Sequence, residues 1–553
     1  MRRLVYVVAC AVLLPVMAAL AATGSSKSDI SRNLIIFNAL VKELVSNYVD
    51  TINIDKLMTT TIGNMLSQID PYTTYYPADD TDELAQISTG QYGGIGAYLG
   101  ERDNTPYFSF PMYDSPARNA GIRHGDVILA INGDSIKPGT TTDRISRRLR
   151  GQPGTKLTVT VRRPYVADSI LTFELMRQSI KVNALPFYGI LDNGVGYISL
   201  TTFNERSAGL VRDAITEMQA SGSLKSIILD LRNNGGGIID GAVQIVGLFV
   251  PKGTEVVRTR GADPKDVKIY KTTRAPIVDS SMPVAVLIDD GTASASEIVA
   301  GALQDLDRAV IIGSRSFGKG LVQASRPLPY DGLLKVTIAR YYIPSGRLIQ
   351  ALDYSHRNAD GTPGHVPDSL TSVFFTRNHR PVRDGGGIAP DVAIAVDSTA
   401  NRLLYNIMAD NWAYDYANRY RAQHPTVADA DHFVVTDSIF DDFKRFIDPA
   451  RFKYDKMCET GLKFLRDAAS VEGYMNDSVA AQFDILEAML KHDLNRDLDY
   501  NREAIKSALD QELSERYFSE ADYTKRMLRY SSAVDTACAV LSDYNRYRRL
   551  LIP

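Results

Sequence analysis

The sequence predicts a multidomain α/β protein, and three observations support this fold class. Residues 190–345 alternate short buried runs with amphipathic stretches, a pattern that indicates βαβ units with helices packed on a sheet. In residues 90–178, glycines crowd together and strand, turn, helix and strand alternate at short spacing. Residues 30–89 carry apolar side chains at helical spacing, and residues 398–553, charged and rich in tyrosine, are also predicted to be helical. A chain of 553 residues has room for about three or four domains.

Composition restricts the function classes. The chain has 44% hydrophobic and 23% charged residues, as globular proteins do, and its formal net charge of −3 gives no basic surface for nucleic acid. Its three cysteines are too few for a disulfide scaffold or a zinc site, so we expect no metal and no cofactor. Cys10 lies in the leader, and whether Cys458 and Cys538 form a bridge stays open.

Residues 1–23 have the features of a secretory signal peptide. A basic start at Arg2 and Arg3 precedes an apolar run from Leu4 to Leu20, and Ala19-Leu20-Ala21 provides a cleavage site between small residues. We therefore expect export to the periplasm or cell envelope of a bacterium. The apolar run is at the lower limit of membrane-spanning length, so an uncleaved anchor that associates with the inner membrane is the alternative.

Residues 28–89 are predicted to form an N-terminal helical region. The apolar residues that recur at helical spacing are Leu34, Ile35, Phe37, Leu40, Val41, Leu44 and Val45. Val49-Asp50 and Asp70-Pro71 interrupt the pattern. We expect the apolar face of these helices to pack on another domain.

Residues 90–178 begin with crowded glycines and continue with a strand–turn–helix–strand succession in Ser115–Gly133. Lys156–Arg162 then alternates polar and apolar residues with a period of two, which predicts a half-buried strand. The run Ser-Pro-Ala, Ala-Gly-Ile, Gly-Asp-Val-Ile and Asn-Gly resembles a PDZ domain. Such domains bind an extended chain end at a sheet edge and hold its carboxylate with backbone N–H groups.

This resemblance places the carboxylate-binding loop at four residues near the start of the region: Gly93, Gly94, Ile95 and Gly96. Phe108–Asp114 lies where a more β-branched strand is usual, so the ligand preference of the domain stays open. The alternative is a PDZ-like module that only braces its neighbour.

Residues 180–397 form the predicted α/β core. The expected strands are Val195–Leu200, Ser226–Arg232 and Val284–Asp289, and the expected helices are Ala208–Met218 and Ile238–Val250. Asn233–Gly237 makes a tight turn into the second helix. Such a turn can present backbone N–H groups to an oxyanion or a phosphate, and it can equally be a plain connection. Residues 350–390 are polar and rich in Gly and Pro, which predicts a surface loop closed by a short strand.

Asp290–Gln323 carries the residues that indicate chemistry. Ser294 opens an apolar helix directly after a buried strand, and Lys319 follows in a loop between two glycines. No histidine lies between these two residues, so the pattern indicates a serine nucleophile whose general base is a lysine.

Lys319 can act as a base only when its amine is neutral. Burial disfavours the charged form, and the apolar neighbours Phe317, Leu321 and Val322 would supply such surroundings. Gln323 could orient the amine by a hydrogen bond without adding charge.

Two other interpretations of these motifs stay open. Ser294 and Glu297 fit a capping box, although one serine can both cap a helix and react. Gly313–Lys319 is close to a phosphate-binding loop, but Gly320 stands where a Ser or Thr would hold magnesium. Residues 323–329 predict a loop that enters a hairpin, whereas a phosphate site of this kind requires a helix.

Residues 398–553 are predicted to be a helical C-terminal domain. They are charged and rich in tyrosine, and they contain no catalytic motif. We expect them to serve in packing, in self-association as a homo-oligomer, or in binding an adaptor protein.

In their order along the chain, these motifs resemble those of the carboxyl-terminal processing peptidases, also called tail-specific proteases. The matching segments within residues 30–395 are Leu66–Tyr72, the PDZ run, Asp230–Gly237, Ser294–Ile298, Phe317–Gly320, Tyr342–Arg347 and Gly387–Asp391. The resemblance implies a crotonase-like core with a PDZ domain inserted after the N-terminal helices.

The resemblance also implies a catalytic set: Ser294 as the nucleophile, Lys319 as the general base and Gln323 as its orienting partner. It selects Ser294 over Ser296. The oxyanion hole would consist of the backbone N–H groups of Gly236 and Ala295. Gly235 stands where the family often has proline, and the backbone group that the site needs is still present.

The sequence therefore predicts an exported serine endopeptidase that recognises apolar C-terminal tails of proteins through its PDZ domain and cleaves peptide bonds by a Ser–Lys mechanism. Three rivals belong to other classes. A catalytically idle PDZ scaffold of the cell envelope would not need the Ser294, Lys319 and Gln323 set. A crotonase-like acyl-transfer enzyme would bind coenzyme A and would not need a PDZ domain. A nucleotide-binding protein would bind ATP.

Overall fold

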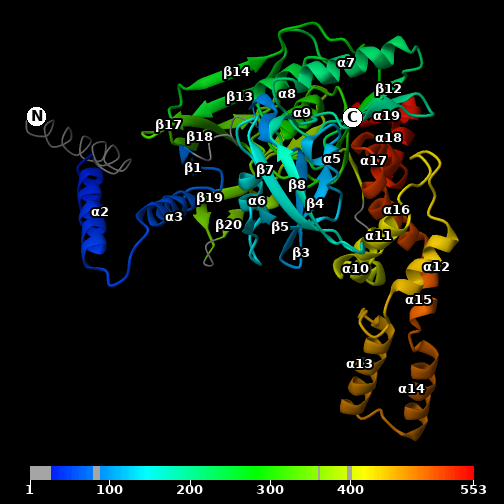
Figure 1. Cartoon of the computed structure of the whole chain (residues 1–553). Coiled ribbons are helices and arrows are strands. Elements are labelled where there is room, and N and C mark those ends of the chain that lie inside the picture. Colours follow the sequence, from blue (N-terminus) through cyan, green and yellow to red (C-terminus); the bar gives the residue numbers. More distant parts are fainter. Residues whose placement is uncertain (1–26, 79–87, 359–361, 395–400, 553) are drawn as a thin grey trace, which may run out of the picture. The chain divides into compact units, whose positions relative to one another are not determined.

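The computed structural model describes residues 27–78, 88–358, 362–394 and 401–552 (Figure 1). The predicted signal peptide at residues 1–23 lies outside these ranges. The chain divides into two units, Met1–Tyr75 and Tyr76–Pro553. Among the helices in the described ranges, none is both long enough and apolar enough to cross a membrane.

The described residues of the first unit form α2 (Lys27–Asn47) and α3 (Ile54–Ser67), in agreement with the helical periodicity. α3 begins after Asn53, whose side chain accepts a hydrogen bond from the Lys56 N–H at 2.9 Å. Leu34 and Ile35 of α2 are exposed. Packing of this apolar face on another domain therefore stays a prediction.

An antiparallel sheet forms the PDZ-like region. Its strands are, in spatial order, β3 (Ala97–Arg102), β4 (Thr105–Pro111), β5 (Val127–Ile131), β7 (Lys156–Arg162) and β8 (Ile170–Met176), with β6 (Asp134–Ser135) paired to β5. This region also contains α5 (Pro116–Asn119), α6 (Thr142–Leu149) and a ladder of β2 (Gln91–Gly94) with β9 (Gln178–Lys181). The predicted period of two in β7 is confirmed, because Leu157, Val159 and Val161 are buried while their neighbours are not.

The α/β core contains a mainly parallel sheet. Its strands are, in spatial order, β10 (Tyr188–Ile190), β11 (Val195–Ser199), β12 (Ser226–Asp230), β15 (Val284–Ile288), β16 (Val310–Gly313) and β23 (Val392–Ala393). Only the β10–β11 pair within this sheet is antiparallel. The α-helices that precede β16 in this core are α7 (Ser207–Ala220), α8 (Ile239–Val246) and α9 (Ala295–Asp305). α8 ends at Val246, four residues before the predicted end.

Helices cover both faces of this sheet. Side chains of β12 alternate between two apolar clusters: Ile227 and Leu229 pack with α7, α8 and α9, whereas Ile228 packs with the last helices of the chain. Those helices are α18 (Ser532–Ser542) and α19 (Tyr544–Leu551). The end of the predicted C-terminal region therefore completes the core that carries the candidate site.

A second sheet of the core pairs β17 (Leu321–Pro327) with β18 (Leu333–Tyr342), and β18 with β13 (Glu255–Gly261), which pairs with β14 (Val267–Lys271). The expected loop at residues 323–329 is therefore wrong for most of its length. β17 pairs along its whole length with β18, and Pro327 lies at its last position. Backbone pairing to β18 outweighs the polar, proline-containing composition that suggested a loop.

The segment 350–390 contains more strand than predicted. Its elements are β19 (Leu352–Arg357), β20 (Pro363–His365), the 3₁₀ turn Asp368–Leu370, β21 (Val373–Phe375) and β22 (Pro381–Arg383). β19 pairs with β20, and β21 pairs with β22, so two short hairpins replace most of the expected loop.

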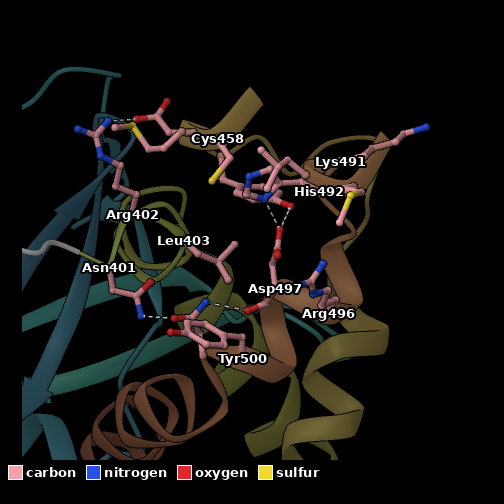
Figure 2. A pocket seen from close by; sticks show the side chains of 15 residues that line it. Asn401, Arg402, Leu403, Cys458, Lys491, His492, Arg496, Asp497 and Tyr500 are labelled. Atoms are coloured by element: carbon pink, nitrogen blue, oxygen red, sulfur yellow. Dashed lines mark hydrogen bonds and ion pairs between the residues drawn. The ribbon is translucent and has the colours of Figure 1, made fainter. Parts of the chain in front are cut away.

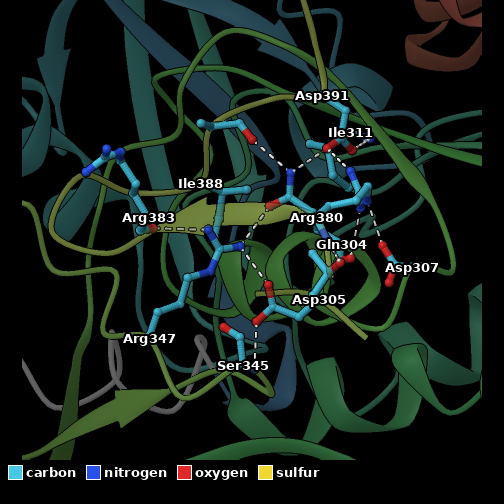
Figure 3. A network of polar contacts seen from close by, with 12 residues as sticks. Gln304, Asp305, Asp307, Ile311, Ser345, Arg347, Arg380, Arg383, Ile388 and Asp391 are labelled. Carbon is cyan, nitrogen blue, oxygen red and sulfur yellow. Dashed lines mark hydrogen bonds and ion pairs between the residues drawn. The ribbon is translucent and has the colours of Figure 1, made fainter. Parts of the chain in front are cut away.

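A buried polar network fixes the C-terminal end of α9 (Figure 3). The Arg347 guanidinium, in a side chain that is only 1% exposed, donates to the Asp305 carboxylate at 2.9 Å. Arg380 contacts Asp307 at 2.7 Å and Asp391 at 2.6 Å. Each buried charge thus has an opposite partner, which makes this network a structural link between α9 and the following loops.

The C-terminal region is helical, as predicted. Its further helices are α10 (Arg402–Ala409), α11 (Trp412–Gln423), α12 (Asp437–Phe446), α13 (Met457–Val471), α14 (Asp477–Leu490), α15 (Leu494–Tyr500), α16 (Arg502–Tyr517) and α17 (Glu520–Met527). An aromatic core around Tyr416, Phe440 and Phe443 holds α11, α12 and α16 together. α13 and α14 form a hairpin (Figure 1). Most of its side chains are exposed.

Candidate active site

Ser294 occupies a strained position between β15 and α9. Its backbone has φ 57° and ψ −116°, a positive φ that is rare and costly for a residue with a Cβ. Hydrogen bonds hold the turn on both sides: the Ala293 N–H donates to Asn234 O at 3.0 Å, and the Ser294 N–H donates to Glu297 Oε2 at 2.8 Å. Strand-to-helix turns of this kind present a nucleophile at the edge of a sheet.

An open pocket of ≈ 780 Å³ gathers the predicted catalytic residues. Ser294, Lys319 and Gln323 all line it, together with Gly235–Gly237. Much of the remaining wall is apolar or aromatic and consists of Ile238, Ile239, Tyr270, Ile298, Leu321, Val322, Ile338 and Tyr341. Residues that are far apart in the sequence therefore meet at one cavity.

Lys319 lies in the loop between β16 and β17, and its half-buried side chain lines this pocket. Gly318 adopts φ 87°, and a Cβ added there would approach the Ala351 Cβ to 2.4 Å, so only glycine fits. On the other side, the Gly320 N–H donates to Gln350 Oε1 at 2.7 Å. These contacts fix the backbone on both sides of the lysine.

Strand β17 follows this loop, which removes the helix that a nucleotide-binding loop requires. The apolar surroundings of the lysine also differ from the prediction. Leu321 and Val322 line the pocket as expected, but Phe317 is 47% exposed and does not line it. Burial alternates here, with Ser316 and Gly318 inside, and this alternation directs Phe317 to solvent.

Gln323 lies in β17 opposite Thr337 of β18, next to a bulge in the pairing. Its side-chain Nε2 donates to Thr337 Oγ1 at 3.2 Å. The donor end of the amide therefore faces the strand, so an interaction that orients Lys319 would use the carbonyl oxygen.

Gly236 and Ala295 come together at the predicted oxyanion position. A Cβ added to Gly236 would lie 2.8 Å from the Ala295 nitrogen and 2.9 Å from the Ser294 Cβ. The Gly236 N–H donates to the Asn234 side-chain oxygen at 2.9 Å. In this conformation one of the two proposed donors already has a partner, and an oxyanion would have to share or replace it.

Asn234 is a structural residue that the sequence analysis did not single out. Its side chain is completely buried, and its Nδ2 donates to Leu200 O at 2.7 Å. Its backbone oxygen accepts from Ser296 Oγ at 2.8 Å. Asn234 thus links the glycine turn to the residue that follows β11 and to the start of α9. Only its place between a strand and three glycines could have indicated this role.

Glu297 is completely buried and accepts four hydrogen bonds. Its donors are Ser316 Oγ at 2.6 Å, Gly318 N at 2.7 Å, Ser294 N at 2.8 Å and Lys319 N at 2.9 Å. Burial raises the pKa of Glu297 to about 7, although the accepted hydrogen bonds act in the opposite direction. The capping contact between Glu297 and Ser294 was predicted, whereas the contacts to residues 316–319 were not.

The four predicted PDZ residues occupy different environments. Gly93 and Gly94 belong to β2, which pairs with β9. Ile95 is buried in the PDZ core. Gly96 has φ 72°, and a Cβ added there would lie 2.5 Å from the Ser115 Cβ. Carboxylate binding by these residues stays a prediction.

Among the described residues, one group has the spacing of metal ligands: His124, Glu512 and Glu515, where the PDZ-like region meets α16. Arg102 lies 3.5 Å from Glu512, and Arg516 lies 2.9 Å from the same carboxylate. Burial and the nearby Arg516 lower the pKa of His124 well below its ordinary value. Two guanidinium groups already balance the two carboxylates, which disfavours a divalent cation there.

A second pocket, of ≈ 690 Å³, lies in the helical C-terminal region (Figure 2). His492 Nδ1 lies 2.7 Å from Asp497 Oδ2, which also accepts from the Tyr454 hydroxyl at 2.6 Å. Cys458 lines the same pocket, and both Cys458 and Cys538 are free thiols. The lining contains no serine, so this pocket does not provide the predicted nucleophile.

Three family models match the chain. Residues 194–354 match the model described as peptidase family S41, and residues 111–163 match a PDZ domain. Residues 403–541 match a domain described as a probable PDZ-protease C-terminal helical domain.

Curated proteins of the same kind are similar over more than half of the chain. A "Carboxy-terminal-processing protease" of Bartonella bacilliformis is 36% identical over 333 residues, which cover 60% of this chain and 75% of that protein. A "Probable CtpA-like serine protease" of Staphylococcus aureus is 34% identical over 329 residues, which cover 59% of this chain and 64% of that protein. A solved photosystem II D1 C-terminal processing protease is 26% identical, with 65% of this chain and 86% of that chain covered at a TM-score of 0.37.

Proposed function

This chain belongs to peptidase family S41, as a carboxy-terminal-processing protease with a PDZ domain, and from this premise we propose that it is an exported serine endopeptidase with a Ser–Lys mechanism. It would recognise proteins by their apolar C-terminal tails. One observation carries the proposal: Ser294, on a strained turn at the start of α9, lines the same pocket as Lys319.

The geometry supports a two-step acyl transfer. The Ser294 hydroxyl would attack the scissile carbonyl carbon, and the neutral amine of Lys319 would accept its proton and return it to the leaving amine. Water, activated by the same amine, would then hydrolyse the acyl-enzyme. Gln323 would orient the lysine through its carbonyl oxygen, since its nitrogen bonds to Thr337.

The developing oxyanion would bind to the backbone N–H groups of Ala295 and Gly236. The Gly236 backbone lies close to the Ala295 nitrogen, since a Cβ added to Gly236 would be 2.8 Å from it. Asn234 holds the Gly236 N–H at 2.9 Å, so the full donor pair would form only when the substrate oxygen competes for that hydrogen.

The pocket wall supports a substrate with apolar side chains near the cut. Ile238, Ile298 and Leu321 line the same pocket as Ser294 and Lys319. We propose that the loop of Gly93, Gly94, Ile95 and Gly96 captures the tail carboxylate, and that the bound chain then enters the pocket as an extended strand.

The proposed organisation is a signal peptide or anchor at 1–23, a helical region at 28–89, the PDZ domain at 90–178, a crotonase-like peptidase core at 180–397 and a helical domain from 398. Alternation of strands and helices around the mainly parallel sheet supports the core assignment. Export to the periplasm or envelope of a bacterium rests on the sequence of residues 1–23.

The test uses the mature protein, Ser294→Ala and Lys319→Ala with an unfolded protein that ends in apolar residues. Mass spectrometry follows the fragments. We expect cleavage by the wild type alone. Binding of the tail without cleavage by any form would instead favour a PDZ scaffold without catalysis.

A further inference from the structure

We propose that Glu297 is a positioning residue of the peptidase. Its single carboxylate fixes the backbone of the nucleophile and the backbone of the general base relative to each other. This inference rests on the proposed function of Ser294 and Lys319. It assigns a catalytic positioning role to a buried residue of the Ser294–Ile298 segment for which the sequence indicated only a helix cap.

The geometry joins the two catalytic segments at one atom. Glu297 Oε2 accepts from the Ser294 N–H at 2.8 Å and from the Lys319 N–H at 2.9 Å. The backbone nitrogens of the proposed nucleophile and base are therefore both tied to the same oxygen, although the two residues belong to different loops. A shift of either loop would break one of these bonds.

The second oxygen anchors the rest of the lysine loop. Glu297 Oε1 accepts from Ser316 Oγ at 2.6 Å and from Gly318 N at 2.7 Å. Ser316 Oγ in turn accepts from the Ile388 N–H at 2.7 Å. The loop that carries Lys319 is thus held from inside by α9 and connected to the segment at Ile388.

Only an ionised carboxylate fits this set of donors. Two oxygens receive two hydrogens each, and an ionised carboxylate has about four acceptor positions. A glutamine would place its NH₂ group against two donors, and an aspartate would be shorter by one methylene. Because no polar side chain of similar size offers two equivalent acceptor oxygens, the arrangement is specific for glutamate.

The site retains this carboxylate in spite of an unfavourable environment. Burial of the side chain is complete and raises its pKa, so an ionised Glu297 is costly to the fold. A plain helix cap needs no such burial, because exposed Ser, Thr, Asp and Glu side chains cap helices without it. The cost is explained if the geometry of Ser294 and Lys319 depends on the four hydrogen bonds that Glu297 accepts, which we call the Glu297 clamp.

The experiment compares Glu297→Gln with a matched control, Asp305→Asn. Asp305 lies on the same helix, is also a buried carboxylate and pairs with Arg347, but it is about 12 Å farther along the axis. Glu297→Gln would place an NH₂ group against two donors, and Asp305→Asn would leave the buried Arg347 without its anionic partner, so both variants should unfold at lower temperature. Only Glu297→Gln should displace the backbones of Ser294 and Lys319.

We expect Glu297→Gln to lower kcat by about 100-fold with KM changed less than about threefold, the size expected for a displacement of about 1 Å. Asp305→Asn should keep kcat close to the wild-type value. An unchanged kcat in Glu297→Gln, or an equal loss in Asp305→Asn, would overturn the proposal.

Hydrogen exchange separates this inference from the proposed function. If wild type and Ser294→Ala are equally inactive, the peptidase assignment fails, but the clamp can still be measured. Amides of residues 314–323 should then exchange faster in Glu297→Gln than in Asp305→Asn. Equal exchange in the two variants would exclude a clamp.

Discussion

At the scale of single residues, two unfavourable features lie side by side. Ser294 has a positive φ, and Glu297, three positions later, is a fully buried carboxylate. Such features persist only where the surrounding structure fixes them, and they concentrate at functional sites. The hydrogen bond from the Ser294 N–H to Glu297 joins the two directly. Their coincidence at one strand–helix junction is a physical argument for Ser294 that is independent of the sequence motif.

Glu297 should give activity and stability opposite pH dependences. Burial raises its pKa from 4.5 to about 7, so the folded protein binds this proton more tightly than the unfolded chain does. Its contribution to stability is therefore complete below about pH 4.5 and is lost as the pH rises through about 7. The clamp requires the ionised form, so kcat should rise over the upper part of the same range.

Thermal unfolding and kcat measured between about pH 5 and 8 test this prediction, with Glu297→Gln as the reference. Loss of the proton from the Lys319 amine should also raise kcat. The pH profile of kcat that remains in Glu297→Gln isolates this contribution. A stability difference between the two proteins that does not change with pH would contradict the assignment to Glu297.

At the scale of elements, the glycine turn before α8 provides a matched pair of substitutions. At Gly236, φ is 98° and an added Cβ would lie 2.7 Å from Ala293 O and 2.8 Å from Ala295 N, which are backbone atoms. At Gly235, an added Cβ meets nothing within 4 Å. We expect Gly236→Ala to lower kcat by about 100-fold or more, as loss of an oxyanion donor does, and Gly235→Ala to keep it. Similar kcat values for both variants would argue against this turn as the oxyanion site.

The elements that the sequence predicted are those with a strong local signal. β7 has a clean period of two, β12 and β15 are short apolar runs, and α9 begins at a capping box. β17 was missed because its strand character comes from pairing with β18, which no local pattern records. The same limit applies within the site. The glycines and the Ser–Lys spacing were visible, but the contacts of Glu297 and Asn234 join segments that only the fold brings together.

At the scale of the whole molecule, the two ends of the C-terminal region differ in importance. α18 and α19 cover one face of the core sheet with Val534, Val540, Leu541 and Leu551, all buried. The hairpin α13–α14 exposes most of its side chains. Sequence alone showed both segments as charged helices, because an amphipathic pattern does not say which surface an element will cover.

Removing residues 531–553 should therefore unfold the peptidase core. Burial of each large apolar side chain contributes about 1.5–3 kcal/mol, so the loss of four of them approaches the total stability of a typical domain, about 5–15 kcal/mol.

Tyr547→Phe tests the same contact between α19 and the core sheet with a smaller change. Its hydroxyl accepts from the Val284 N–H at 3.1 Å, next to the start of β15, so its loss should cost about 1–2 kcal/mol without changing kcat.

Deletion of residues 461–487, with a short Gly-Ser linker in their place, is the control for this truncation. Because the hairpin buries little, the deleted protein should keep its unfolding temperature within a few degrees and its cleavage of an unfolded substrate. Circular dichroism and fragment analysis measure both properties. A truncated chain that stays folded and active without residues 531–553 would show that α18 and α19 are dispensable. The exposed sheet face would then have to be stable in water, which its run of Val195, Ile228 and Leu287 makes unfavourable.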